Sequence, residues 1–365
     1  MSDRNRGDFI LIFTVAVLVI AGVIMVFSAS YYTALNTQGD PYYYLKRDII
    51  WALLGSALMF VASKVSYKTY AHWSTMILGV AIVLLLLVFT PFGVSINGAQ
   101  RWIGVGGFTI MPGELAKPAV AIFTAKFISA DPERIKSFKN GVLPLLVVMG
   151  LVAALILKQP NMSTAVTVAG IMICVMMVGG MKIPHLAVLL GGGVGAGGLL
   201  MAIEPYRWKR FISFLDPFKD AQGAGFQVVQ SLLALGSGGI FGVGIGKSIQ
   251  KTLYLPEPMN DFIFAIIGEE TGYLGCMFFI FLYTIFVWRG IHIAIKAKDL
   301  FGTLLAAGLT SMVAIQAVLN IAVVTSSMMP TGVALPFVSW GGNSLAISMG
   351  CAGILVNISK NSLRY

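Results

Sequence analysis

Long uninterrupted apolar runs, separated by short polar stretches, dominate the chain. A helix needs about 20 apolar residues to cross a hydrocarbon layer of roughly 30 Å. The runs are continuous rather than alternating, which excludes the strands of a membrane β-barrel. The pattern therefore predicts an all-α polytopic membrane protein with ten transmembrane helices. These lie near 9–28, 49–63, 74–90, 114–129, 142–157, 163–180, 184–203, 262–288, 301–325 and 337–357.

One connection is much longer than the others. Residues 204–261, between the seventh and eighth predicted helices, are expected to form a long extracellular loop within a single membrane domain covering 1–365. Basic residues of short loops favour the cytoplasmic side. With the N-terminus inside, thirteen basic residues fall on the cytoplasmic side and four in the short outer loops. The charge pattern therefore predicts that both termini are cytoplasmic.

Composition agrees with this reading. Only 11% of the 365 residues are charged and 57% are hydrophobic, whereas soluble domains carry roughly a quarter charged residues. A soluble enzyme and a nucleic-acid binder are both excluded. The net charge of +10 is explained by topology and by contact with anionic membrane lipids. One alternative stays open, that the basic residues of the long loop face an anionic ligand: Arg207, Lys209, Arg210, Lys219, Lys247 and Lys251.

The sequence gives little support for a catalytic nucleophile or for a metal site. All three cysteines fall inside predicted helices, and all three histidines lie at or near the predicted cytoplasmic edge. No catalytic Ser-His or Cys-His arrangement can assemble on the outer face, and no zinc-type spacing is present. We therefore expect no protein metal site.

Two glycine patterns resemble nucleotide-binding motifs. Gly193, Gly195 and Gly198 spell G-x-G-x-x-G, but they lie inside the seventh predicted helix with no strand before them. Gly191 and Gly195 of the same helix have the GxxxG spacing that favours close helix packing, which is the preferred interpretation. Gly246-Lys247-Ser248 resembles the end of a P-loop, but Phe241 stands where the first glycine is required. The second stretch is read either as a flexible turn or as a backbone-amide cradle for a phosphate.

Few acids remain once those in tails and short loops are set aside. Glu114 opens the fourth predicted helix and Lys117 follows on the same face. They form either a structural ion pair or the wall of a polar cavity that contacts substrate. Glu269 and Glu270 lie inside the eighth predicted helix, so at least one must face protein or water; the sequence assigns them no chemical role.

Asp261 stands at the boundary between the long loop and the apolar run that begins at Phe262. Partial desolvation there should raise its pKa and make it a better proton acceptor near neutral pH. The alternative is a helix N-cap, for which Asp is a favoured residue. Glu257, flanked by two prolines, lies four residues earlier and would approach Asp261 if the segment turns.

Eight stretches together resemble the SEDS family of polytopic cell-wall glycosyltransferases, which includes FtsW, RodA and SpoVE. They are 97–102, 112–117, 159–165, 210–217, 254–258, 261–265, 268–270 and 336–345. The stretch 248–251 is more similar to the FtsW/SpoVE branch than to RodA. The chain departs from the family at Asn161, where an aspartate is common, and at Met259-Asn260, where His-Thr is often found.

The resemblance implies a peptidoglycan glycosyltransferase of the bacterial cytoplasmic membrane. Such an enzyme joins lipid II, a disaccharide-pentapeptide on undecaprenyl pyrophosphate, into glycan strands at the outer face. The reaction inverts the anomeric carbon, needs a general base for the attacking hydroxyl, and needs positive charge for the departing pyrophosphate. A class B penicillin-binding protein is the implied partner. The rival functions are a lipid II flippase and a non-enzymatic scaffold of the cell-wall synthesis complex.

The resemblance also implies roles for particular residues. Asp261 matches the proposed catalytic aspartate of the family. Arg101, Lys117 and Arg47 are the basic residues expected near the pyrophosphate, and Glu114 is expected to share the polar wall with Lys117. Glu257 is expected to shape or support the loop. A divalent cation, Mg²⁺ or Mn²⁺, could accompany the substrate's pyrophosphate without a dedicated protein site.

Overall fold

A bundle of long apolar helices makes up most of the structure. The computed structural model describes residues 7–96, 98–105, 108–203, 211–212, 214–223, 225–252 and 254–362. Each of the ten predicted stretches contains a helix. These helices are α1 (Phe9–Gln38), α2 (Tyr43–Lys64), α4 (Ser74–Leu87), α5 (Pro112–Ala130), α6 (Leu143–Lys158), α7 (Met162–Val178), α8 (Ile183–Ile203), α11 (Ile263–Lys296), α12 (Leu300–Val324) and α13 (Gly342–Lys360).

Shorter elements join them. They are α3 (Tyr67–His72), the 3-10 turns η1 (Arg134–Lys136) and η3 (Pro217–Asp220), the π-helical turn η2 (Phe138–Val142), and α10 (Phe226–Ser237). Among the described residues, five helices are both long and apolar enough to cross a membrane: α1, α6 with its η2 extension, α11, α12 and α13. The long predicted loop is not structureless, because α10 and η3 lie within it.

The core surrounds α12, which packs against α5, α7 and α11, while α2 lies along α13. Buried apolar side chains from all these helices form one continuous cluster. Lipid-facing apolar side chains are exposed in the structure, which is the expected arrangement when a hydrocarbon layer, rather than water, covers them.

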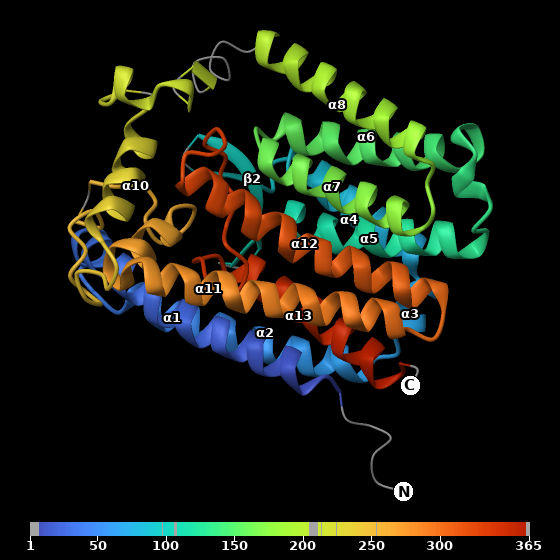
Figure 1. Cartoon of the computed structure of the whole chain (residues 1–365), viewed down its shortest axis with the longest axis horizontal. Helices are drawn as coiled ribbons and strands as arrows, with labels where there is room; N and C mark the ends of the chain where they lie inside the picture. Colours follow the sequence, from blue (N-terminus) through green and yellow to red (C-terminus); the bar gives the residue numbers. More distant parts are fainter. Residues whose placement is uncertain are drawn as a thin grey trace, which may run out of the picture.

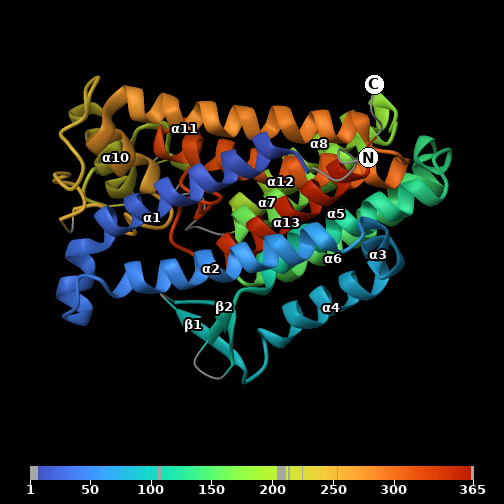
Figure 2. The ribbon, with the colours of Figure 1, turned by 90° about the horizontal axis from the view of Figure 1, so that it is seen from below.

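The start of α1 and the end of α13 lie at the same end of the bundle (Figure 1). Asp8 accepts a hydrogen bond from the Leu11 N–H (3.0 Å) and so caps α1. The Asp8 N–H donates to Ser359 Oγ (3.0 Å), and Arg289 Nε donates to Asp8 Oδ2 (2.9 Å). Helix α10 lies at the opposite end, as does the segment that leads into α11 (Figures 1 and 2).

The prediction of an all-α protein is wrong in one place. Three antiparallel strands in the order β1-β2-β3 connect α4 to α5: β1 (Gly93–Ile96), β2 (Ala99–Val105) and β3 (Phe108–Ile110). Gly98 takes the left-handed conformation (φ +76°) between the first two strands, a conformation that favours glycine. The protein is therefore mostly helical, with a small sheet whose strand β2 contacts α5, and Figure 2 shows this sheet at the edge of the bundle.

Helix α11 is broken at Gly272, whose φ of +67° and ψ of −165° are not helical. The glycine-rich stretch before α11 docks against this break and satisfies the freed backbone groups on both sides. A Cβ at Gly272 would lie 2.4 Å from Gly242 N, so the two backbones approach too closely for side chains. The bonds run from Val243 N to Glu269 O (3.0 Å), Gly244 N to Glu270 O (3.0 Å), Tyr273 N to Gly239 O (2.9 Å) and Leu274 N to Ile240 O (3.2 Å).

The close packing predicted for Gly191 and Gly195 is not seen. Both lie in α8, and a Cβ added at either would meet no described atom within 4 Å. The spacing of small residues is necessary for close packing but does not supply the opposing helix.

Candidate active site

A cavity of about 640 Å³ lies at the α10 end of the molecule, where five separate parts of the chain converge. Its charged lining residues are Arg101, Lys158, Glu257 and Asp261. Among the described residues, the lining is Gly98, Ala99 and Arg101 of the sheet; Leu157, Lys158, Pro160, Asn161, Met162 and Ser163 around the α6–α7 turn; Gln227 of α10; Glu257, Asp261 and Phe262 before α11; and Met329, Pro330, Thr331 and Gly332 after α12.

Asp261 is half-buried in the turn before α11 and faces this cavity. Phe262, rather than Asp261, occupies the N-cap position of α11, and no side chain caps that helix. The alternative reading of Asp261 as the N-cap is therefore wrong. Asp261 contributes instead to the wall of the cavity.

One buried amide on α12 fixes the Asp261 backbone. Asn320 Nδ2 donates to the carbonyl oxygen of Asp261 (2.8 Å) and to that of Val333 (2.7 Å). The asparagine is 1% exposed, so both bonds form away from water, where they are hard to replace. Asn320 thereby ties the aspartate to the connection between α12 and α13.

The following turn of the same connection holds the residues before Asp261. Ser339 Oγ donates to the Asn260 carbonyl (2.6 Å), and the Trp340 N–H donates to the Met259 carbonyl (2.9 Å). Tyr283 of α11 in turn donates its hydroxyl to the Pro336 carbonyl (2.5 Å). The Asp261 turn is thus anchored by bonds to backbone carbonyls, which hold its position whatever the side chains there are.

Gly332 closes the space beside the Asp261 carboxylate. A Cβ at this position would lie 2.9 Å from Asp261 Oδ2, closer than real Cβ contacts come. The Gly332 carbonyl also accepts a hydrogen bond from Ser163 Oγ (2.8 Å) of α7. The glycine therefore permits the close approach of the loop to the carboxylate.

Two basic residues stand across the cavity. Arg101 lies on β2 and directs Nε at the Gln159 carbonyl (3.2 Å) and Nη2 at the Pro160 carbonyl. This contact joins the sheet to the α6–α7 turn. Lys158 ends α6, is exposed, and lies over the Phe89 ring (5.2 Å from Nζ to the ring centroid). From the sequence, Lys158 is only one of the four basic residues of the short outer loops, and nothing there indicates that it lines the same cavity as Asp261.

Glu257 reaches the same cavity from an unusual backbone conformation. Its φ is +52°, a left-handed value that is uncommon for residues other than glycine. The Asn260 N–H donates to the Glu257 carbonyl (3.1 Å), and Asn260 Nδ2 donates to Glu257 Oε2. The segment therefore turns sharply between Glu257 and Asp261, which brings both carboxylates to one cavity.

Glu114 and Lys117 form the ion pair that their spacing predicts, with Lys117 Nζ 2.7 Å from Glu114 Oε2. Both side chains are buried, and Lys117 Nζ also donates to Gln316 Oε1 of α12. Neither residue is among the described lining of the cavity. Of the two readings, the structural ion pair fits these contacts. Gln316 lies one turn before Asn320, so the same face of α12 serves the ion pair and the Asp261 turn.

Arg47 also lies away from this cavity. It is exposed near the start of α2, and its guanidinium carbon lies 4.3 Å from the centroid of the Tyr43 ring. Its predicted contact with pyrophosphate stays a prediction.

The basic residues of the segment 204–261 do not act as one group. Arg207, Lys209 and Arg210 lie outside the described residues. Lys251 is 2% exposed and forms an ion pair with Glu270 at 2.6 Å, so it is not a surface residue facing a ligand. Sequence reasoning missed this pair, because the two residues belong to different predicted elements.

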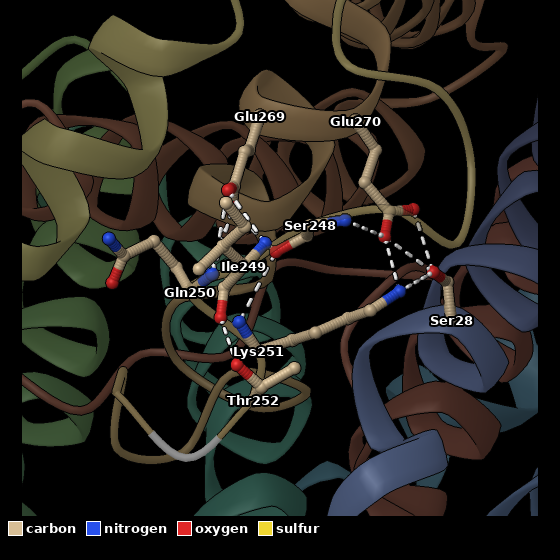
Figure 3. A network of polar contacts seen from close by, with 8 residues as sticks. All are labelled: Ser28, Ser248, Ile249, Gln250, Lys251, Thr252, Glu269 and Glu270. Atoms are coloured by element: carbon tan, nitrogen blue, oxygen red, sulfur yellow. Dashed lines mark hydrogen bonds and ion pairs between the residues drawn. The ribbon is translucent and has the colours of Figure 1, made fainter.

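The amides after Gly246 bind carboxylates of this same chain. Ile249 N donates to Glu269 Oε1 (2.9 Å), and Ser248 N donates to Glu270 Oε1 (3.4 Å). Lys247 donates its amide N–H to the Gly244 carbonyl (3.1 Å), so the stretch forms a turn. The amide N–H groups of residues 248–250 bind the two glutamates to which the sequence assigned no role, which speaks against a phosphate cradle (Figure 3).

Within the described part of the chain, no group of three or more His, Cys, Asp or Glu residues could hold a metal ion. The three cysteines are free thiols inside helices. The described residues contribute two carboxylates, Glu257 and Asp261, and two cations, Arg101 and Lys158, to the cavity.

Comparison with known proteins decides the family. A family model for FtsW, RodA and SpoVE, described as a cell cycle protein, matches residues 9–364. The chain belongs to the FtsW/RodA/SpoVE family. It is 41% identical to stage V sporulation protein E of Bacillus subtilis over 100% of both chains. It is 38% identical to the protein named probable peptidoglycan glycosyltransferase FtsW of the same organism, over 96% of this chain and 90% of that one.

Solved structures of the family agree with the fold. Rod shape determining protein RodA of Thermus thermophilus matches with a TM-score of 0.73 at 26% identity, covering 98% of both chains. A chain from a peptidoglycan synthase complex, studied for its coordination of polymerization and crosslinking, matches with a TM-score of 0.78 at 27% identity, covering 97% of both chains. The predicted family, and its likeness to FtsW and SpoVE, are confirmed. The chain is a mostly helical multi-pass membrane protein.

Proposed function

We propose that this FtsW/RodA/SpoVE family member is a peptidoglycan glycosyltransferase that joins lipid II units into glycan strands, with Asp261 as general base. The observation that carries the proposal is the cavity that Asp261 lines together with Arg101 and Lys158. A lipid-linked sugar transfer needs a carboxylate and positive charge in one place. Relatives named as probable peptidoglycan glycosyltransferases support the reaction class.

The proposed chemistry is an inverting displacement. The 4-hydroxyl oxygen of the acceptor sugar attacks the anomeric carbon of the donor, forming the new glycosidic bond. The bond from that carbon to the pyrophosphate oxygen breaks, and its electron pair leaves with the pyrophosphate. Asp261 takes the hydroxyl proton. Because pyrophosphate is already a good leaving group, the second carboxylate of a typical glycosidase is not needed.

Arg101 and Lys158 are proposed to stabilise the departing pyrophosphate. Arginine offers planar donors suited to phosphate oxygens, and lysine acts as a point charge. Arg101 is held by carbonyls of the α6–α7 turn, which would keep its guanidinium in place during the reaction. Lys117 and Glu114 are proposed to support α5 against α12 from within the bundle.

A divalent cation that arrived with the pyrophosphate would find the carboxylates of Asp261 and Glu257 on the cavity wall. Magnesium commonly uses one or two carboxylates together with phosphate oxygens, so these residues fit such an ion. Glu257 is otherwise proposed to shape the turn before Asp261, through its contacts with Asn260.

The topology follows from the same proposal. We infer ten transmembrane helices in the bacterial cytoplasmic membrane, with both termini cytoplasmic and residues 204–261 on the outer side of the single domain. In support, the start of α1 and the end of α13 share one end of the bundle, whereas α10 and the segment that leads into α11 lie at the other (Figure 1). Both of these contribute residues to the cavity. A lipid II sugar presented at the outer face would then meet Asp261.

The implied partner is a class B penicillin-binding protein, which would crosslink the new strands. The related synthase complex, in which polymerization and crosslinking are coordinated, supports such a pairing. The test combines the purified protein, this partner and labelled lipid II. Glycan strands are expected with the native chain and none with Asp261→Asn. Movement of labelled lipid II across proteoliposomes without any polymer would support the flippase instead, and neither activity would support the scaffold.

A further inference from the structure

A buried ion pair joins three parts of the chain near the candidate site. Lys251 Nζ lies 2.6 Å from Glu270 Oε1 of α11 and 2.9 Å from Ser28 Oγ of α1. Ser28 Oγ in turn donates to Glu270 Oε2 (2.7 Å). Figure 3 shows the ammonium group between the glutamate and the serine. Each of the three residues is less than 7% exposed, so the lysine is fully enclosed by its partners.

Glu269 holds the residues just before Lys251. Its carboxylate accepts the N–H groups of Ile249 (2.9 Å) and Gln250 (3.3 Å) and the hydroxyl of Ser248. Two adjacent glutamates of α11 therefore hold residues 248–251 in place. Glu269 accepts hydrogen bonds from backbone N–H groups, and Glu270 forms an ion pair with Lys251. These contacts lie beside the break at Gly272, where backbone groups of α11 also form hydrogen bonds with the glycine-rich stretch.

Residues 248–251 are followed in the chain by Glu257 and Asp261, which line the cavity. The Gln250 carbonyl accepts the N–H of Leu255 (2.9 Å), whose side chain is 2% exposed. Glu257 follows in its left-handed conformation, and the turn closed by Asn260 then brings Asp261 to the cavity. The positions of both cavity carboxylates are therefore set at one side by Asn320 and at the other by the residues around Lys251.

A contribution to the stability of the fold does not by itself explain why a charged pair is buried at this position. Removing two charges from water costs several kcal/mol per ion, and an apolar pair of similar volume is often at least as stabilising. The ion pair instead defines one position for Lys251, because its buried ammonium group finds partners only where Glu270 and Ser28 meet. A methionine of similar length would fill the space without that requirement.

We propose that Lys251, held by Glu270 and Ser28, is a positioning residue that fixes the entry of the segment carrying Glu257 and Asp261 into the cavity wall. The effect on reaction rate rests on the proposed function, whereas the effect on segment position does not. The two parts are therefore measured separately.

Segment position is measured by the distance between spin labels at Tyr254 and Ile291, in a cysteine-free background. Both positions are exposed, and the rise of α11 places them roughly 40 Å apart, within the range of the method. Lys251→Met leaves Glu270 as an unpaired buried charge and can fail to fold. The double variant K251M/E270Q removes both charges and should keep the fold.

The double variant is expected to show at least a twofold broader distance distribution than the native chain. With lipid II and partner, it should lower kcat about tenfold while KM changes by less than twofold, because the carboxylates move but the rest of the cavity stays. An unchanged distance distribution with a native kcat would overturn the proposal. Loss of folding in the double variant would also overturn it, because the pair would then be needed for stability rather than position.

Lys46→Met provides the matched control. Lys46 Nζ lies 2.8 Å from Asp40 Oδ2, and its hydrogen bond lowers the pKa of that carboxyl. This pair is exposed and lies outside residues 248–261. Its loss should change neither the distance distribution nor the rate. If the double variant broadens the distances while the native chain makes no polymer, the positioning proposal stands and the proposed function fails.

Discussion

Replacing Gly332 by alanine tests whether the position of the Asp261 carboxylate matters for the reaction. The added Cβ would lie 2.9 Å from Asp261 Oδ2 in the present geometry. Ordinary contacts begin at 3.4 Å, so the carboxylate must move away by about 0.5 Å or the loop must retreat by as much. Gly332 has no left-handed backbone conformation, so alanine adds no backbone strain of its own.

The size of the effect follows from this displacement. A misplacement of about 1 Å at a reacting group can cost roughly 10²-fold in rate. A shift of half that size therefore corresponds to about a tenfold loss, or about 1.4 kcal/mol in the activation free energy. The fold should be unaffected, because Gly332 is exposed to the cavity and its bond to Ser163 uses only its carbonyl.

The assay is the initial rate of glycan formation from labelled lipid II by the purified protein with its partner. Gly236→Ala is the matched control, because this α10 residue has no neighbour within 4 Å of an added Cβ among the described atoms. We expect about a tenfold lower kcat for Gly332→Ala and a native rate for the control. A native rate for both variants, with native thermal stability, would refute the role given to the carboxylate position.

Three further changes test the supports around the site, each by the thermal unfolding midpoint in detergent. Asn320→Leu removes two hydrogen bonds and should cost about 2 kcal/mol, so an unchanged midpoint would contradict its anchoring role. Lys117→Met strands a buried Glu114 and should cost about 3–5 kcal/mol, whereas the double variant K117M/E114Q should recover most of it. Gly242→Ala places a Cβ 2.2 Å from the Glu270 carbonyl at a φ of +79°, which should cost at least about 1 kcal/mol; a stable variant would show that the glycine stretch does not dock as described.

Much of the fold could be predicted because membrane helices are encoded locally. A run of about 20 apolar residues is sufficient to predict a helix wherever it occurs, and each predicted run contains one. The pair of Glu114 and Lys117 is equally local, since a spacing of three residues on a helix brings side chains together.

The sheet and the broken helix were not predictable in this way. Strands of three to seven residues with glycine among them give no clear alternation, so the connection from α4 to α5 reads as a loop. The break at Gly272 lies in an apolar helix where one glycine is common. Its meaning depends on Gly242 and its neighbours, which dock from about 30 residues earlier in the chain.

The site was predictable only in part. Asp261 could be singled out by its place at a membrane boundary and by family resemblance, and Arg101 by resemblance alone. Lys158 carried no signal beyond its charge, because its place in the cavity depends on the end of α6 lying near the start of α11. Lys251 and Glu270 are 19 residues apart and come from a polar and an apolar segment, so only the tertiary structure reveals them as partners.

The central claim, that Asp261 is the general base, is tested most directly by one rate. The initial rate of glycan formation is measured for Asp261→Asn beside the native chain. Asp40→Asn is the control, because it makes the same substitution at an exposed carboxylate that is not among the described lining of the cavity. A general base contributes about 10²- to 10⁴-fold, so the Asp261→Asn rate should fall at least 100-fold while the control stays native. An Asp261→Asn rate within twofold of the native rate would contradict the account.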